Sequence, residues 1–140
     1  MNTAPLGVTA PQGFEAAGIH CGIKKPGILD LALVVSAVPG PIAGVFTKNR
    51  VVAAPVLLDR RHLRQHRGRA IIINSGNANA CTGTPGMRAA TAMATAVAEH
   101  LAIPVHQVFV GSTGVIGRVL PIDRIQAGIP TLMEIGRAHV

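Results

Sequence analysis

The segment RAIIINSG, residues 69–76, restricts the fold of this chain more than any other feature. It is β-branched, continuously apolar at its centre and flanked by turn residues, which is typical of a buried strand. A loop of small and polar residues follows at 77–86, and the Ala-rich run 87–102 then predicts a helix of good intrinsic propensity. The narrow Ala and Met face of that helix allows it to approach a sheet closely.

The remaining elements are predicted from apolar runs and turn residues. Strands are expected at 29–38, 42–47, 54–59 and 105–110, the first two as an antiparallel pair across Pro39-Gly40-Pro41, and a short basic helix at 60–65 closed by Gly68. Asp123 is a predicted N-cap, although Gly128 and Pro130 should interrupt any helix that follows. This order fits an α/β (α+β) chain or a layered sandwich, with no repeat and no linker between two domains.

The composition indicates an ordered domain with an aliphatic core. Hydrophobic residues make up 49% of the chain and charged residues 14%, with three Phe and neither Tyr nor Trp. The net charge of +7 raises nucleic acid as a partner, but only the run 59–69 is densely basic and no aromatic stacking residues accompany it. We interpret this run as a solvated face, with a patch for an anionic partner as the alternative.

Cysteine spacing and hydropathy exclude several classes of protein. Cys21 and Cys81 form no CxxC pair, which argues against zinc and against a disulfide framework. Cys81 is interpreted as a small buried filler, with a nucleophile as the alternative. The N-terminus does not resemble a signal peptide and no apolar run could span a bilayer, so a cytoplasmic protein is expected.

The histidines show no metal-ligand pattern. His62 and His66 are spaced i, i+4 in the basic run, and we favour surface positions over a chance metal pair. His20 and His106 have no evident carboxylate partner, which disfavours either as a general base. No metal and no cofactor are predicted.

The glycine-rich run GSTGVIG, residues 111–117, is a candidate site with several interpretations. It lacks the Lys-Ser/Thr of a Walker A loop and the spacing of GxGxxG. Ser112 could be a nucleophile only beside a base, and nothing local supplies one. The Thr113 hydroxyl and the backbone N–H groups are the parts of an oxyanion hole, but spacing alone favours a plain turn.

A second candidate follows the buried strand, where INSGNANACTG spans residues 73–83. Asn74, Asn77 and Asn79 offer amide donors and acceptors, with Ser75 and Thr82 beside them. A self-bonded connection is one interpretation, and a polar wall of a site next to the helix N-terminus is the other.

Five blocks occur in an order that resembles one enzyme family. They are GVTAPQGFEAAGIHCGIKK at 7–25, DLALVVS at 30–36, AGVFTKNRVVAAPV at 43–56, NSGNANACTG at 74–83 and STGVIGRVLP at 112–121. Across residues 7–132 the chain closely resembles the ornithine acetyltransferase family of arginine biosynthesis, also called glutamate N-acetyltransferase or the bifunctional ArgJ family.

The resemblance implies a specific chemistry. Precursors of this family cleave themselves before an internal Thr, and the new N-terminal Thr of the β chain is the nucleophile. It takes acetyl from N-acetylornithine and passes it to glutamate, and some members also use acetyl-CoA. The resemblance implies a layered sandwich of the ArgJ/DmpA-like type and assigns the oxyanion hole to the Thr113 hydroxyl and the Gly114 N–H.

Part of the family pattern is missing from this sequence. The Lys/Gly-Ala-Thr-Met cleavage block and the β chain do not occur in it. We therefore interpret residues 1–132 as an α-chain portion that lacks the nucleophile and the substrate-binding positions, so that the sandwich is incomplete and the chain alone inactive. Residues 134–140 depart from the family and resemble a translated sequencing adapter, so a non-native tail is predicted at 133–140.

Partners and alternatives follow from this interpretation. The expected partners are the β chain of the same precursor, further α/β pairs, and the substrates N-acetylornithine, glutamate and acetyl-CoA, with no nucleic acid and no membrane. The alternatives are a related self-processing N-terminal-nucleophile aminopeptidase and a non-catalytic module that binds an acidic partner through the basic run. Without a β chain the α portion should expose apolar surface and associate.

Overall fold

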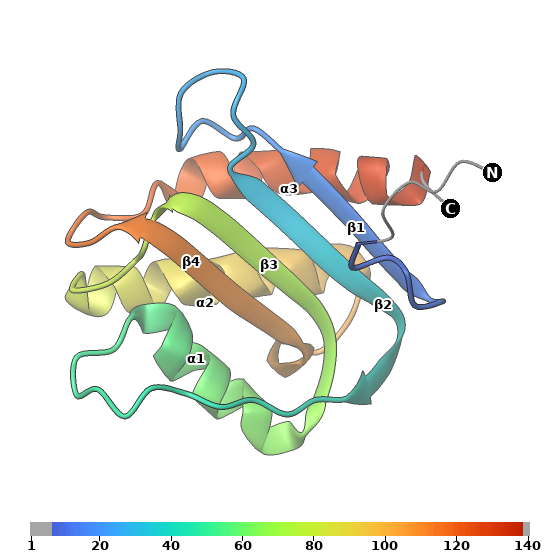
Figure 1. The fold of residues 1–140 in the computed structure, drawn as a ribbon, viewed down its shortest axis with the longest axis horizontal. Helices are drawn as coiled ribbons and strands as arrows, with labels where there is room; N and C mark the ends of the chain where they lie inside the picture. The colour runs from blue at the N-terminus through green and yellow to red at the C-terminus, as the bar shows by residue number, and fades with distance from the viewer. Residues whose placement is uncertain (1–6, 139–140) are drawn as a thin grey trace.

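A computed structural model describes residues 7–138 as one four-stranded sheet with helices packed against it (Figure 1). The strands are β1 (Phe14–Ile19), β2 (Leu31–Pro41), β3 (Arg67–Asn77) and β4 (Val108–Val115). They lie in the order β1-β2-β3-β4, antiparallel except for the parallel pair β3 and β4. The expected mixed α+β fold is confirmed.

The helices are α1 (Ala54–His62), α2 (Gly83–Leu101) and α3 (Ile122–Ala138), with short 3-10 turns at Leu63–Gln65 and Val105–Gln107. In Figure 1, α2 and α3 lie behind the sheet and α1 lies beside β4. Helix α2 connects the parallel strands β3 and β4, as such a crossover requires.

The core lies between the sheet and α2 and α3. Alternate residues of β2 and β3 face the helices, so Leu31, Leu33 and Ile72 are buried. The helices meet them with small and branched side chains: Ala90, Met93, Ala94, Val97, Ile125, Ile129 and Leu132. The expected aliphatic core, with a closely packed Ala and Met helix face, is confirmed.

The opposite face of the sheet carries apolar side chains that no described element covers. Val34 pairs with Ile71, and Ala32 pairs with Ile73, on this side of the sheet. Ile71 and Ile73 remain 39% and 38% exposed, and Phe14 of β1 is 41% exposed. We call this surface, formed by Phe14, Val34, Ile71 and Ile73, the open sheet face.

Two predicted strands are wrong. Residues 42–53 form an irregular segment, because β2 continues through Pro39-Gly40-Pro41 and pairs Gly40 with Gly68 in place of turning back. Residues 54–59 lie in α1, since a short apolar run does not distinguish a strand from a buried helix. Pro55 in the first turn favours that helix, because proline costs nothing where the N–H has no partner.

The predicted interruption of the last helix is also wrong. Helix α3 runs unbroken past Gly128 and Pro130. Pro130 has no N–H to donate to the Gln126 carbonyl. Both residues are exposed, so water can bind that carbonyl instead. At Gly128 a Cβ would lie only 2.8 Å from Ile19 Cδ1, so glycine lets α3 approach the sheet closely.

Element boundaries differ from the predictions in four other places. Helix α2 begins at Gly83, four residues before the predicted start, and β4 begins at Val108 and continues through the glycine-rich run to Val115. The turn after α1 ends at His66, which has a φ of 52°, and not at Gly68. Asp123 lies inside the first turn of α3 and is not its N-cap. Helix α3 runs across residue 132, the predicted boundary between the α-chain portion and the non-native tail. A continuous helix does not test that boundary, because native and foreign sequence can both be helical.

Candidate active site

The glycine-rich run lies where the two parallel strands end. Ser75 pairs with Thr113 and Gly76 with Gly114 at the carboxyl ends of β3 and β4. Thr113 and Gly114 are both exposed. Because side chains alternate along a strand, Thr113 projects from the same face as Ile73, the open sheet face.

Gly114 occupies a position that only glycine fits. Its φ is +134°, outside the range that L side chains readily adopt. A Cβ there would lie 2.3 Å from the carbonyl carbon of Gly76 and 2.5 Å from the nitrogen of Asn77. The backbones of β3 and β4 therefore touch at the point where the Gly114 N–H is held.

The neighbouring Ser112 is engaged on the other side of the sheet. Its hydroxyl donates to Asn74 Oδ1 at 2.5 Å, and Asn74 is fully buried. Asn74 in turn donates through Nδ2 to the Asn77 carbonyl. The described structure brings no base to Ser112, so it offers no support for a serine nucleophile.

The Asn-rich segment is bonded to itself and its surroundings. Asn77 Nδ2 donates to the carbonyls of Arg118 and Val119, and its Oδ1 accepts from the Asn79 N–H. Asn79 Nδ2 donates to the Gly86 carbonyl. Asn74, Asn77 and Asn79 are all buried. This geometry favours the self-bonded connection over the polar wall of a site.

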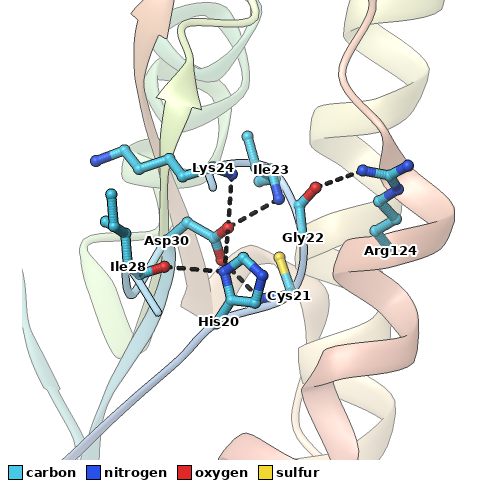
Figure 2. Close-up of polar contacts among 8 residues, drawn as sticks. All are labelled: His20, Cys21, Gly22, Ile23, Lys24, Ile28, Asp30 and Arg124. Atoms are coloured by element: carbon cyan, nitrogen blue, oxygen red, sulfur yellow. Dashed lines mark hydrogen bonds and ion pairs between the residues drawn. The ribbon is translucent and has the colours of Figure 1, made fainter. Parts of the chain in front are cut away.

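A buried carboxylate organises the loop between β1 and β2, at the same edge of the sheet (Figures 1 and 2). Asp30 accepts N–H bonds from Cys21 at 2.6 Å and from Ile23 and Lys24 at 2.8 Å each. Burial by itself raises the pKa of Asp30, but the N–H groups of Cys21 and Lys24, the Cys21 thiol and the Ile23 N–H outweigh it and lower the pKa to about 2. Asp30 is therefore a permanent anion at neutral pH.

His20 does have a carboxylate partner, which corrects the sequence-based expectation. Its Nδ1 lies 3.2 Å from Asp30 Oδ2 and 2.9 Å from the Ile28 carbonyl oxygen. Since a carbonyl can only accept, Nδ1 carries the proton. The adjacent Cys21 is no thiolate at neutral pH, because burial and Asp30 raise the pKa of its thiol to about 12.

Two side chains of α1 bind the free edge of β4. His62 is 8% exposed and its Nδ1 bonds to the Val108 carbonyl at 2.8 Å, so the predicted surface position is wrong. Asp59 accepts from the Val110 N–H at 3.0 Å. Burial raises the pKa of Asp59 to about 6, against the opposing Val110 bond, and burial lowers the pKa of His62.

Among residues 7–138 no group of three His, Cys, Asp or Glu could hold a metal ion, and no helix is long and apolar enough to cross a membrane. Cys81 is exposed, which corrects its interpretation as a buried filler. Several arginines of the basic run bind nearby backbone carbonyls, as Arg60 binds Thr47 and Arg69 binds Ser36. These bonds fit the solvated face.

One cleft could hold a small anion. It has a volume of about 290 Å³ and lies beside Gly76 and Asn77 at the end of β3. Arg118 and Arg124 supply its charged lining, and Arg124 also donates to the Gly22 carbonyl. A carboxylate matches this lining better than a neutral ligand does.

Sequence reasoning missed Asp30, Asp59 and the buried role of His62. The available signal for Asp30 was its position, because it is an isolated acidic residue directly before the buried apolar strand that begins at Leu31. Nothing in the sequence pairs Asp59 or His62 with β4, because the bonds join residues 51 and 46 positions apart.

Comparisons with known proteins agree with this geometry. The ArgJ family model matches residues 15–139. The chain is 50% identical over 122 residues to the arginine biosynthesis bifunctional protein ArgJ of Geobacter sulfurreducens, covering 87% of this chain and 31% of that protein. It is 53% identical over 125 residues to the ArgJ protein of Symbiobacterium thermophilum, covering 88% and 31%.

Two solved structures share the fold. The ornithine acetyltransferase of Mycobacterium tuberculosis, complexed with ornithine, matches at a TM-score of 0.88 and 49% identity, over 91% of this chain and 69% of that one. The ArgJ protein of Bacillus halodurans matches at a TM-score of 0.81 and 45% identity, over 84% and 62%. The chain spans about a third of the length of the curated relatives it matches. On this family match and these identities, the chain belongs to the ArgJ family.

Proposed function

We propose that this chain is the α-chain portion of an arginine-biosynthetic acetyltransferase and supplies its oxyanion hole from Thr113 and Gly114. The observation that carries the proposal is the end of β4. There an exposed hydroxyl, which projects from the open sheet face, is followed directly by an exposed, sterically fixed glycine. Preorganised donors of this kind stabilise the charge that develops on an acyl oxygen.

The proposed reaction uses a nucleophile from the β chain. The N-terminal Thr hydroxyl of that chain attacks the acetyl carbonyl of N-acetylornithine, and its own amine takes the proton. The resulting tetrahedral oxyanion is stabilised by the Thr113 hydroxyl and the Gly114 N–H. As this intermediate collapses, the N-terminal ammonium returns its proton to the leaving nitrogen, so ornithine departs as the amine and an acetyl ester remains on Thr. The amine of glutamate then attacks that ester, N-acetylglutamate departs, and the Thr hydroxyl is restored with the proton lost by the glutamate amine.

We propose that the β chain covers the open sheet face. The exposed side chains of Phe14, Ile71 and Ile73 support this, because apolar residues gathered on one sheet face normally face another layer. Such a layer would place a β-chain nucleophile on the face from which Thr113 projects. Further α/β pairs, a cytoplasmic location and acetyl-CoA as a second acetyl donor belong to the same proposal.

The activity is tested in a chimera that supplies the rest of the enzyme. Residues 7–132 replace the aligned segment of the Mycobacterium tuberculosis ornithine acetyltransferase, whose fold they share. We expect the chimera to transfer acetyl from N-acetylornithine to glutamate, and the isolated 140-residue chain to transfer none.

Two neighbouring hydroxyls give a matched pair of variants. Thr113→Ala should lower kcat by about 100-fold with little change in Tm, because it removes one donor to the oxyanion. Ser112→Ala should leave kcat within about threefold and lower stability by about 1 kcal/mol, since its hydroxyl only bonds Asn74. Equal losses of kcat in both variants would contradict the assignment. Acetate release without a glutamate acceptor would indicate a hydrolase instead.

We also propose that residues 1–132 are the native α-chain portion and that 133–140 are a non-native tail. The resemblance of residues 134–140 to a translated sequencing adapter supports the tail. The match of the family model through residue 139 opposes it. Re-sequencing the gene beyond codon 132 tests this. A frame that continues into an Ala-Thr-Met block supports the proposal, and a stop directly after codon 140 contradicts it.

A further inference from the structure

The buried Asp30 carboxylate has no part in the reaction proposed above, yet it lies at the same edge of the sheet as Thr113. Asp30 is 2% exposed, and its carboxylate holds three backbone N–H groups of the β1–β2 loop, those of Cys21, Ile23 and Lys24 (Figure 2). A carboxylate that accepts several backbone N–H bonds is a rigid anchor, because each bond is charge-assisted.

The backbone of Asp30 is tied to the strand that carries the site. Its N–H donates to the Ile19 carbonyl at 2.9 Å, and its carbonyl accepts from the Ser75 N–H at 2.9 Å. Ser75 is the register partner of Thr113. Asp30 thus bonds both to the β1–β2 loop and to Ser75 near the end of β3.

The loop that Asp30 organises presses on Gly76. A Cβ at Gly76 would lie 2.8 Å from Ile23 Cγ2 and 3.0 Å from Lys24 Cγ, so the loop and the strand are in full contact. Gly76 contacts Gly114 just as closely, since a Cβ at Gly114 would lie 2.3 Å from the Gly76 carbonyl carbon. The loop, Gly76 and Gly114 are therefore packed against one another with no space for a side chain at either glycine.

We propose that Asp30 is a positioning residue for the oxyanion hole, acting through the 21–24 loop and Gly76 on the Gly114 amide. This rests on the function proposed above. Loss of the carboxylate releases the loop, which lets Gly76 and then Gly114 shift. An amide displaced by a fraction of an ångström still permits substrate binding but stabilises the oxyanion less, so kcat falls and KM does not.

Asp30→Asn in the chimera tests the proposal. The Asn side chain keeps one acceptor oxygen, but its NH2 group replaces the other oxygen. The NH2 then faces the N–H of either Cys21 or Ile23, which loses its acceptor. We expect kcat to fall by about 10- to 30-fold and KM for N-acetylornithine to change less than about threefold. Since Asp30 stays ionised at neutral pH, the factor should be the same from pH 6 to 9.

The control is a second carboxylate with a comparable contact. Asp59 accepts a backbone N–H of β4 at Val110, four residues before the proposed site. Asp59→Asn should leave kcat within about threefold at temperatures below its Tm. His20→Ala should do the same, because three N–H bonds still hold the loop.

A double-mutant cycle identifies the donor on which Asp30 acts. Since Asp30 is proposed to hold the Gly114 amide and Thr113 supplies the other donor, the kcat losses of Asp30→Asn and Thr113→Ala should multiply. An Asp30→Asn loss that disappears in the Thr113→Ala background would overturn the inference, as would a His20→Ala loss equal to that of Asp30→Asn. If the wild-type chimera is active and Asp30→Asn leaves its kcat unchanged, only this inference is contradicted. If the wild-type chimera is inactive, the proposed function itself is contradicted.

Discussion

At the scale of single residues, the end of β4 depends on one glycine more than on any side chain. A Cβ at Gly114 would overlap the backbone of Gly76 and Asn77, and backbone atoms cannot move aside as a flexible side chain can. The same run holds Gly117, which has a φ of +82° but nothing within 4 Å of a Cβ. A substitution at Gly114 therefore tests steric overlap with the neighbouring backbone, whereas one at Gly117 tests only the strain of a positive φ.

We expect Gly114→Ala in the chimera to abolish measurable acetyl transfer and to cost at least ~2 kcal/mol of stability. Gly117→Ala should cost about 1 kcal/mol, the strain of a left-handed residue, and retain most of the activity. Thermal unfolding and initial rates measure both. A Gly114→Ala variant as stable as Gly117→Ala would show that the strands separate easily at this point.

The candidate residues were only partly predictable from the sequence, for a physical reason. Thr113 and Gly114 follow from a local block that resembles a family, whereas spacing alone favoured a plain turn. Asp30 is recognisable only through bonds to a loop six to nine positions earlier and a contact between that loop and Gly76. Such contacts depend on which strands become neighbours, and residue order does not state that.

At the scale of elements, strands and helices were predicted well where their pattern was long. The run 69–76 and the Ala-rich helix are confirmed within a few residues as β3 and α2. The short run 54–59 was assigned to a strand, and only its packing shows a helix. Gly128 and Pro130 oppose a helix locally, but buried Ile125, Ile129 and Leu132 stabilise α3 through tertiary contacts.

The contact between α1 and β4 makes stability depend on pH. Burial raises the pKa of Asp59 from its ordinary value of 3.8 to about 6, so the folded state favours its protonated form. The stabilisation is complete below the unfolded pKa and is lost as the pH rises through about 6. His62 acts oppositely, because its lowered pKa removes stability as the pH falls below 6.5.

Asp59→Asn isolates the carboxylate. Asn retains an oxygen for the Val110 N–H and removes the buried charge, so the variant should be more stable than the wild type at pH 7. The expected gain is about 1 kcal/mol, after allowing for the partial exposure of Asp59. Most of this gain should be lost by pH 4, close to the ordinary pKa of 3.8. Thermal unfolding of chimera and variant at both pH values measures the difference, and an equal gain at pH 4 would contradict a charge effect.

At the scale of the whole molecule, this chain is a sheet with α2 and α3 on one face and α1 at the free edge of β4. The helical side is closely packed, whereas Ile71 and Ile73 at the centre of the sheet remain more than a third exposed. An apolar sheet face without a covering layer associates with any similar face. In the proposed enzyme the β chain covers this face, so the proposed β chain and the solubility of this chain are linked.

We therefore expect the isolated 140-residue chain to form oligomers or aggregates, measured by light scattering at micromolar concentration. Ile71→Lys combined with Ile73→Lys should shift it toward monomer, because two charges repel and stay hydrated on that face. Val45→Lys is the matched control, since Val45 is 98% exposed but lies in the irregular segment after β2. In the chimera the same double variant, Ile71→Lys with Ile73→Lys, should weaken assembly with the β chain. A monodisperse wild-type monomer, or a Val45→Lys variant that dissociates equally well, would show that the open sheet face does not drive association.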